Sequence, residues 1–367
     1  MIKTYFILFL VFIFQIIVAQ SKPTKPFRVV GYYCGVGIPV DSFEIEKLTH
    51  LIFSFGHLEE NKFAIHTNID STTIQQMVKL KSRNPNLKVM LSLGGWSGCA
   101  TCSDVFNTTQ GRKDFATSLQ KITHYFKTDG IDLDWEYPAI KGFPGHTYRK
   151  ADKHNFTLLL KEIRKTMGEN FEISFAAGGF TAYIDSSIEW KAINKYVDFI
   201  NVMSYDLIHG YSTSTGHHTA LYSTPQQAES TNHAVKMIMN NGIPSNKIVI
   251  GSAFYGRYFH VNNTTNNGLY QSGSFYKSVS YKLIQDSIIN HSNGFEMLWD
   301  SIAQAPYAIN KSRKLFFTFD NEQSIQLKTK YALQKQLGGI MFWQLYDDKF
   351  HNGLLNCIDA ELKKHTK

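Results

Sequence analysis

The chain has 367 residues, an ordinary globular composition with 14% aromatic residues, and a formal net charge of +8. Its lysines and arginines are dispersed and no nucleic-acid-binding module is recognisable, so we interpret the charge as a solvated surface and expect no nucleic-acid partner. This length suits one large domain or two medium-sized ones.

The first residues have the pattern of a secretion signal. Lys3 supplies positive charge, residues 5–18 are apolar apart from one glutamine, and Ala19 is a suitable last residue before cleavage. We therefore expect residues 1–19 to be a signal peptide and the protein to be secreted, to the extracellular space or, in a bacterium, the periplasm. A retained membrane anchor is the alternative, although the apolar run is short for a membrane span. No later stretch is apolar enough to span a bilayer, so we expect no stable membrane insertion after cleavage.

Short β-rich runs alternate with helical stretches along the rest of the chain. The predicted strands are Arg28–Tyr33, His50–Phe55, Lys88–Leu93, Gly130–Trp135, Glu172–Ala177, Phe199–Ser204, Ile248–Ser252 and Gly339–Phe342. The predicted helices are Thr72–Arg83, Arg112–Lys127, Lys153–Met167, Pro225–Asn240, Gln323–Gln336 and Gly353–Lys363. This alternation favours an α/β fold, a closed (β/α)8 TIM barrel formed by residues 20–367. An open doubly wound sheet is the alternative, but no glycine-rich phosphate loop follows the first strand.

The interval between the seventh and eighth predicted strands is much longer than one crossover helix requires. We therefore expect residues 258–319 to form a small α+β insertion subdomain. In a barrel it would emerge at the C-terminal face, where active sites lie, and would form one wall of a cleft.

Four cysteines follow the predicted signal peptide, and a disulfide is the default expectation in an exported protein. Cys99 and Cys102 are close enough in sequence to close a tight local loop, but a redox pair or half of a zinc site are alternatives. Zinc would need further Cys or His ligands at a recognisable spacing, which the sequence lacks. Cys34 could pair with Cys357 only if the two ends of the chain meet.

The most informative segment is the acidic run Asp129–Tyr137. Asp132, Asp134 and Glu136 alternate with apolar residues, so a β-strand would place the three acids on one face. If the apolar face packs against helices, the acids point inward, where desolvation and mutual repulsion raise at least one pKa. A carboxyl group protonated near neutral pH is suited to general acid catalysis. An exposed strand with an anionic face and a calcium loop are the alternatives, although the intervening apolar residues argue against the loop.

Other predicted strands also end in polar or aromatic residues, as the C-terminal face of a barrel requires. These strand ends are Ser92–Trp96, Met203–Asp206, Phe254–Arg257 and Met341–Gln344. Gly94 and Gly95 in the first of them could let a ligand approach the backbone. Each segment has an ordinary structural explanation when taken singly, and their convergence favours a functional site.

These segments together resemble family 18 of the glycoside hydrolases, the chitinases. The family pattern Asp-x-x-Asp-x-Asp-x-Glu is matched by residues 129–136, and Ser92–Gly95 and Met203–Asp206 resemble two further signatures. Trp343 stands where the family has a tryptophan at the barrel floor. Segments Gly268–Gln271, Trp299–Asp300 and Ala305–Tyr307 resemble the insertion of chitinases with deep clefts.

The resemblance implies a substrate-assisted mechanism, in which the acetamide oxygen of the sugar attacks its own anomeric carbon. Glu136 would protonate the leaving oxygen and then activate water. Asp134 would hold the acetamide N–H and stabilise the oxazolinium-like intermediate, and Asp132 would share a proton with Asp134. Tyr205 would position the acetamide oxygen, and Asp206 would form hydrogen bonds near the cleavage point.

Several side chains are implied at the substrate. Trp343 would lie beneath the sugar, and the further candidates for the substrate site are Trp96, Tyr32, Phe55, Tyr137, Arg257 and Met203. The flanking aromatic residues could equally be packing residues. Gln344 is a departure, because many relatives carry Glu at this position.

The resemblance therefore implies a secreted chitinase that cleaves β-1,4 bonds between N-acetylglucosamine units of chitin or chito-oligosaccharides. A chitin-binding lectin of the same fold and an endo-N-acetylglucosaminidase acting on N-glycans are the alternatives, since the fold does not fix the substrate. We expect a monomer that needs no metal and no organic cofactor.

Overall fold

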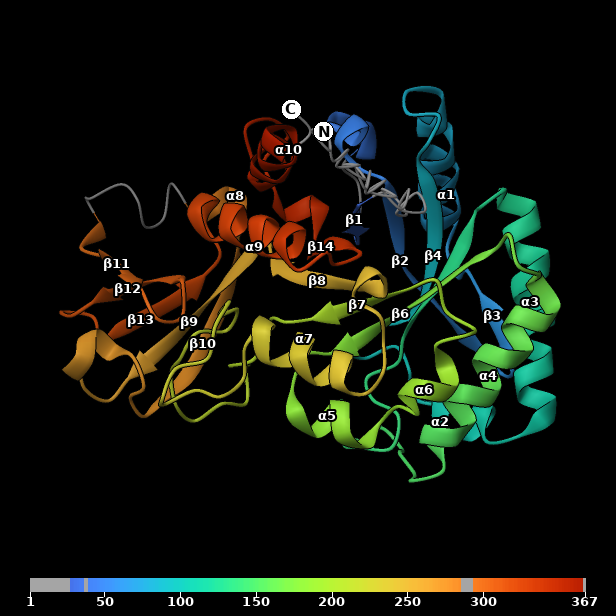
Figure 1. Ribbon diagram of the computed structural model, residues 1–367, viewed down its shortest axis with the longest axis horizontal. Coiled ribbons are helices and arrows are strands. Elements are labelled where there is room, and N and C mark those ends of the chain that lie inside the picture. Colours follow the sequence, from blue (N-terminus) through green and yellow to red (C-terminus); the bar gives the residue numbers. More distant parts are fainter. Residues whose placement is uncertain (1–26, 36–38, 285–292, 366–367) are drawn as a thin grey trace, which may run out of the picture.

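The computed structural model describes residues 27–35, 39–284 and 293–365, so the predicted signal peptide lies outside the described residues. Its centre is a closed barrel of eight parallel strands (Figure 1), because β1 pairs with both β14 and β2. The strands are β1 (Arg28–Tyr33), β2 (His50–Glu59), β4 (Lys88–Gly94), β5 (Gly130–Asp134), β6 (Glu172–Gly178), β7 (Phe199–Met203), β8 (Ile248–Ala253) and β14 (Gly339–Trp343). The prediction of a TIM barrel is confirmed, and the open sheet is excluded. A short strand β3 (Lys62–Ala64) extends β2 as a hairpin.

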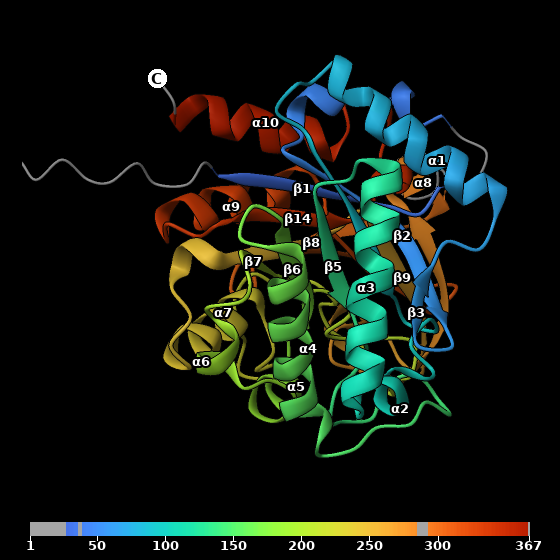
Figure 2. The same cartoon turned by 90° about the vertical axis from the view of Figure 1, so that its right-hand side faces the viewer.

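Helices surround the barrel, and Figure 2 shows α3 and α4 side by side on its outer surface. They are α1 (Asn68–Lys79), α2 (Cys102–Phe106), α3 (Thr109–Phe126), α4 (Asp152–Met167), α5 (Thr181–Ser186), α6 (Trp190–Ile193), α7 (Thr231–Asn240), α9 (Glu322–Gln334) and α10 (Leu354–His365). None of the described helices is both long and apolar enough to cross a membrane.

Capping residues explain two differences from the predicted helix bounds. α1 begins before Thr72 because Thr67 and Asp70 form a capping box, in which each side chain accepts a hydrogen bond from the other residue's backbone N–H. α7 begins after Pro225 because the Ser230 hydroxyl accepts a hydrogen bond from the backbone N–H of His233.

The strands divide their side chains between two cores. The interior of the barrel holds a small apolar cluster that includes Val30, Ile52, Met90, Phe199 and Met341. The larger core lies between the strands and the helices, and it contains the β5 residues Ile131 and Leu133. This alternation directs Asp132, which lies between those two residues, into the barrel.

A second, five-stranded antiparallel sheet lies beside the barrel (Figure 1), between β8 and β14 in the sequence. Its strands are β9 (Tyr255–Val261), β10 (Gly273–Ser280), β11 (Glu296–Asp300), β12 (Ala305–Asn310) and β13 (Leu315–Phe319), and the short helix α8 (Tyr281–Ile284) follows β10. The expected insertion is therefore present. Its first strand already begins at Tyr255, almost directly after β8, rather than at residue 258.

A buried ion pair joins the end of this insertion to the barrel. Lys328 Nζ on α9 lies 2.6 Å from Asp320 Oδ2, and both side chains are fully buried. Asp320 follows β13 and also accepts hydrogen bonds from the backbone N–H of Ala253 at 3.0 Å and from the Thr219 hydroxyl at 3.1 Å. The pair therefore connects α9, the insertion, β8 and the loop after β7.

The described cysteines settle the pairing. Cys99 and Cys102 form a disulfide at the start of α2, and Cys34 and Cys357 are both free thiols. The local loop is thus the correct reading of Cys99 and Cys102, and the pairing of Cys34 with Cys357 is wrong.

Candidate active site

Three acidic side chains gather at the C-terminal end of β5. Asp132 and Asp134 belong to the strand, and Glu136 lies two residues beyond Asp134. Trp135 points the opposite way and packs against Phe106 in the outer core, with 5.6 Å between ring centroids. The predicted alternation of inward-facing acids and outward-facing apolar residues therefore continues past the end of β5.

Asp132 is a fully buried carboxylate at the centre of a hydrogen-bond network. Oδ2 accepts from the hydroxyls of Tyr32 and Ser92, each at 2.9 Å, and Oδ1 accepts from Ser174 at 2.6 Å and from the Asn201 amide at 3.1 Å. Burial raises the pKa of Asp132, although these four hydrogen bonds act in the opposite direction. Because both oxygens are occupied, Asp132 is suited to supporting its neighbour rather than to contacting a ligand.

Asp134 differs sharply from Asp132. It is also buried, but its Oδ1 atom has no hydrogen-bond partner within the described residues. Burial, the charge of Glu136 and the charge of Asp132 together raise the pKa of Asp134 well above its usual value. A buried acceptor without a partner is costly and is characteristic of a functional site, so Asp134 is available to bind a ligand N–H group.

Glu136 is only partly exposed. Its burial by the surrounding protein, together with the nearby negative charge of Asp206, raises the pKa of its carboxyl group to about 7. It therefore carries a proton up to near neutral pH. A carboxyl group with this pKa can act both as a general acid and, after losing the proton, as a general base.

Asp206 is held in its ionised form beside Glu136. It adopts a φ of 54° just after β7, and it accepts hydrogen bonds from the Tyr255 hydroxyl at 2.7 Å and from Arg257 Nε at 2.5 Å. A second nitrogen of Arg257 binds its other oxygen. Burial acts to raise the pKa of Asp206, but hydrogen bonds and charge from His218 and Arg257 hold it well below the usual range.

Asp206 and Arg257 were both predicted to lie at the substrate site, and the structure shows which groups they bind. Asp206 was expected to form hydrogen bonds near the cleavage point, but both of its oxygens are engaged by Arg257, one of them also by Tyr255. Arg257 was expected to border the cleft, but its guanidinium is used to bind Asp206. The two side chains form a charge-assisted ion pair, and their contacts with a ligand stay predictions.

Aromatic rings form the floor of the site. Trp343 at the end of β14 stacks on Phe55, with centroids 5.6 Å apart and ring planes 14° apart, and both rings are partly exposed. The peptide bonds after Ser54 and after Trp343 are both cis. Tyr32 lies 5.9 Å from Trp343, but it is almost fully buried and its hydroxyl donates to Asp132, so it supports the site and is not a platform for a ligand.

Other predicted residues have different surroundings. Trp96 is 39% exposed and lies 6.2 Å from the ring of Tyr137, which packs on Phe180 at 5.5 Å. Met203 lies in the apolar cluster inside the barrel, against which Tyr205 and Trp343 pack, and its contact with a ligand stays a prediction. Tyr205 is partly exposed, and its hydroxyl lies 3.8 Å from the sulfur of Met341. Burial and the surrounding carboxylates raise the pKa of Tyr205 well above its usual value, which keeps its hydroxyl available as a donor.

The two glycines at the end of β4 meet a structural requirement. Gly94 and Gly95 have φ values of 108° and 80°. A Cβ atom on Gly94 would lie 2.4 Å from the carbonyl oxygen of Asp134, and a Cβ on Gly95 would lie 2.5 Å from the ring of Phe55. The glycines therefore let the end of β4 approach Asp134 and Phe55, and the approach of a ligand to their backbone stays a prediction.

Gln344 has a clear local role. Its Oε1 atom accepts a hydrogen bond from the backbone N–H of Cys34 at 2.8 Å. It thereby ties the end of β1 to the residue that follows Trp343. An uncharged amide makes this bond, so the departure from Glu at this position leaves the support of Trp343 intact.

Four residues that support the acids were not among the predicted site residues. Ser174 and Asn201 bind Asp132, and Tyr255 and His218 face Asp206. A signal was present for the first two, because each is a polar residue within an otherwise apolar strand and lies on the inward-facing side. Tyr255 lies within the predicted strand end Phe254–Arg257 but was not singled out there, and His218 gave no comparable signal because the loop that carries it has no regular register with the barrel.

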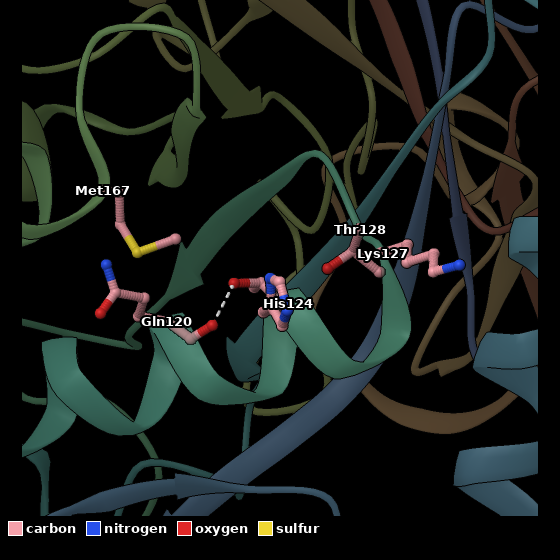
Figure 3. A pocket seen from close by; sticks show the side chains of 6 residues that line it. Gln120, His124, Lys127, Thr128 and Met167 are labelled. Carbon is pink, nitrogen blue, oxygen red and sulfur yellow. Dashed lines mark hydrogen bonds between the residues drawn. The ribbon is translucent and has the colours of Figure 1, made fainter.

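A hollow elsewhere on the surface is not part of this site. Figure 3 shows it beside α3, lined by Gln120, Thr123, His124, Lys127, Thr128 and Met167. Thr128 precedes the start of β5, so the hollow lies at the opposite end of this strand from the three acids.

Comparison with known proteins agrees with this geometry. The model of the Glycosyl hydrolases family 18 matches residues 28–348. Chitinase A1 of Niallia circulans is 34% identical over 79% of this chain, and Probable chitinase 2 of Drosophila melanogaster is 28% identical over 87% of it. The chain spans 44% and 69% of the lengths of these two proteins. A solved structure of a glycoside hydrolase family 18 N-acetylglucosaminidase from Paenibacillus barengoltzii has a TM-score of 0.82 and 32% identity, and the match covers 92% of this chain and 100% of that one.

Proposed function

The chain belongs to glycosyl hydrolase family 18 and is a glycoside hydrolase, and we propose that it is a secreted chitinase that cleaves β-1,4 bonds between N-acetylglucosamine units. The proposal for the substrate rests on the unpartnered oxygen of Asp134 beside the protonated carboxyl of Glu136. One group can accept an N–H donor while the other gives a proton to a leaving oxygen. An N-acetylated sugar supplies both partners.

The state of the carboxyl groups supports a mechanism without a protein nucleophile. Asp132 and Asp206 have both oxygens engaged in hydrogen bonds, and raised pKa values favour the neutral forms of Asp134 and Glu136. A neutral carboxyl group is a poor nucleophile, so the attacking atom must come from elsewhere. The acetamide oxygen of the substrate meets this need, as in the substrate-assisted glycosidases.

The first step then follows. Glu136 transfers its proton to the glycosidic oxygen as the bond from that oxygen to the anomeric carbon breaks. The acetamide oxygen forms a new bond to the anomeric carbon on the opposite face, and Asp134 accepts the hydrogen bond of the acetamide N–H while positive charge develops on the ring. Tyr205 donates its hydroxyl to the acetamide group and holds it in line, and the stacked rings of Trp343 and Phe55 carry the apolar face of the sugar.

The second step restores the enzyme. Glu136, now ionised, removes a proton from a water molecule, and the water oxygen attacks the anomeric carbon from the side that the leaving group vacated. The bond to the acetamide oxygen breaks, and the product keeps the original β configuration. Because two displacements occur at the same carbon, the mechanism is retaining.

Secretion is proposed on two grounds. The N-terminal segment 1–19 has the pattern of a signal peptide. The disulfide between Cys99 and Cys102 is the kind of bond that persists in oxidising compartments outside the cytosol.

Product analysis on two substrates tests the proposed function. The purified protein is incubated separately with chitin hexamer and with an N-glycan that carries an N-acetylglucosamine pair at its core, and a Glu136→Gln variant serves as the blank. We expect shorter chito-oligosaccharides from the hexamer and no cleavage of the N-glycan. Cleavage of the N-glycan alone would identify an endo-N-acetylglucosaminidase, and binding of the hexamer without any product would identify a lectin. Release of single sugars alone would match the name of the similar Paenibacillus barengoltzii enzyme.

A further inference from the structure

His218 is a fully buried histidine to which the mechanism above assigns no part. It lies in the loop between β7 and α7, and its backbone is fixed on both sides. Its N–H donates to the Thr318 hydroxyl at 3.0 Å, and its carbonyl oxygen accepts from the N–H of Leu207 at 3.0 Å. Leu207 directly follows Asp206, so the same loop holds His218 and Asp206 in a fixed relation.

The imidazole ring of His218 faces the carboxylate of Asp206. Its Nδ1 atom lies 3.5 Å from Asp206 Oδ1, and the ring packs at 5.3 Å from the ring of Tyr255. Neither ring nitrogen has a hydrogen-bond partner in the part of the chain that the structure describes, so the 3.5 Å approach of Nδ1 to Asp206 is an electrostatic contact that falls short of a hydrogen bond. A buried ring with free nitrogen atoms is costly unless one of them serves a nearby group, and the Asp206 carboxylate is the group that Nδ1 addresses.

We propose that His218 is a positioning residue whose Nδ1–H closes the set of donors around Asp206 and keeps the charge of this carboxylate directed at Glu136. The proposal rests on the proposed function, because the negative charge of Asp206 matters only if Glu136 must stay protonated until it transfers its proton. His218 itself touches neither the substrate nor the reacting atoms.

The charges around His218 favour a neutral ring that donates one proton. Burial lowers the pKa of His218, and the Arg257 cation acts in the same direction, while Asp206 and Asp320 act against them. Arg257 on β9 is already paired with Asp206, so a second cation in this buried cluster would be poorly compensated. A neutral donor strengthens the hold on Asp206 without cancelling the charge that acts on Glu136.

A matched pair of variants separates the effect of the His218 Nδ1 donor on Asp206 from the effect of packing. Asn has an amide nitrogen at the branch position that Nδ1 occupies, whereas Leu has the same branched shape without a donor. His218→Asn therefore keeps a donor that faces Asp206, and His218→Leu removes it. His218→Phe keeps a planar ring without nitrogen atoms and serves as a second donor-free variant if the Leu variant does not fold.

The direct readout is the titration of Asp206 itself, followed by NMR of protein labelled with 13C at the aspartate carboxyl carbons. The Asp206 resonance is assigned by its absence from an Asp206→Asn variant. We expect wild type and His218→Asn to hold Asp206 ionised down to the same low pH, and the donor-free variant to begin protonating about one pH unit higher. Identical titration of the Asn and donor-free variants would reduce His218 to a packing residue and overturn the proposal.

The second readout is the pH profile of kcat/KM on a chitin oligomer. In wild type the alkaline limb has its midpoint near the Glu136 pKa of about 7, because Glu136 must be protonated to act. Asp206 stays ionised near pH 7 in every variant, but without the donor its carboxylate can turn away from Glu136 and repel the Glu136 anion less, so the donor-free variant should shift this midpoint to lower pH while His218→Asn should not. If wild type cleaves no chitin oligomer, the proposed function fails, and the carboxyl titration still decides the role of His218.

Discussion

Replacing Glu136 by Gln should lower kcat on chitin oligomers by a factor of about 10²–10⁴, the usual contribution of a general acid–base group. The amide has nearly the same shape as the carboxyl group, but it cannot transfer a proton to the glycosidic oxygen. Glu136 is partly exposed and has a pKa raised to about 7, so the change removes reactivity from the site without leaving a buried charge unpaired. Initial rates of reducing-end release measure the loss.

The loss of kcat identifies Glu136 as the general acid only if the variant still folds and binds the substrate. We expect the Glu136→Gln variant to bind chitin oligomers as wild type does, which quenching or enhancement of tryptophan fluorescence at Trp343 would report. Glu169→Gln, a change of the same chemistry at an exposed position after α4, is the control and should retain full activity. Undiminished turnover by Glu136→Gln would remove the general acid from our account.

Replacing Lys328 by Met should lower the free energy of unfolding by about 3–5 kcal/mol, the range found when one partner of a buried ion pair is removed. The change leaves the Asp320 carboxylate fully buried with no cation, in contact with the N–H of Ala253 and the hydroxyls of Thr219 and Ser324. Met has a length and volume similar to the apolar part of Lys, so the loss reports on the charge rather than on a cavity. Urea unfolding followed by circular dichroism measures it.

Two further variants make this stability prediction specific. Lys330→Met changes an exposed residue two positions further along α9 and should alter the free energy of unfolding by no more than about 0.5 kcal/mol. The double variant Lys328→Met with Asp320→Asn removes both charges and should recover part of the loss. A loss below about 1 kcal/mol in the Lys328→Met variant would mean that the pair contributes little to joining the insertion to the barrel.

The acidic run shows how far local pattern reaches. Alternation along Asp132, Asp134 and Glu136 was enough to predict three inward acids, because side-chain direction in a strand depends only on position. The identity of the groups that bind each acid could not be predicted in the same way. Tyr32 and Asn201 reach Asp132 from positions 100 and 69 residues away in the sequence, and only closure of the barrel brings them together.

The errors have a common physical origin. Tyr32 was expected at the substrate because it stands at a strand end, but its neighbours inside the barrel bury it almost completely. Gly94 was interpreted as a point where a ligand could approach the backbone, but the requirement for glycine comes from the carbonyl oxygen of Asp134, which a Cβ atom would meet. In both cases the sequence shows which residue type stands at the position, but it does not show which neighbouring group requires that type.

The most direct test of the central claim, that cleavage proceeds by two displacements at the anomeric carbon, is the anomeric form of the first product. Chitin hexamer is hydrolysed in D2O with enough enzyme to outpace mutarotation, and the new reducing ends are followed by 1H NMR from the first minutes. A retaining, substrate-assisted reaction at Glu136 and Asp134 predicts β product first, with the α form appearing later as the sugar equilibrates. Initial formation of the α anomer would show a single displacement by water and would contradict the account.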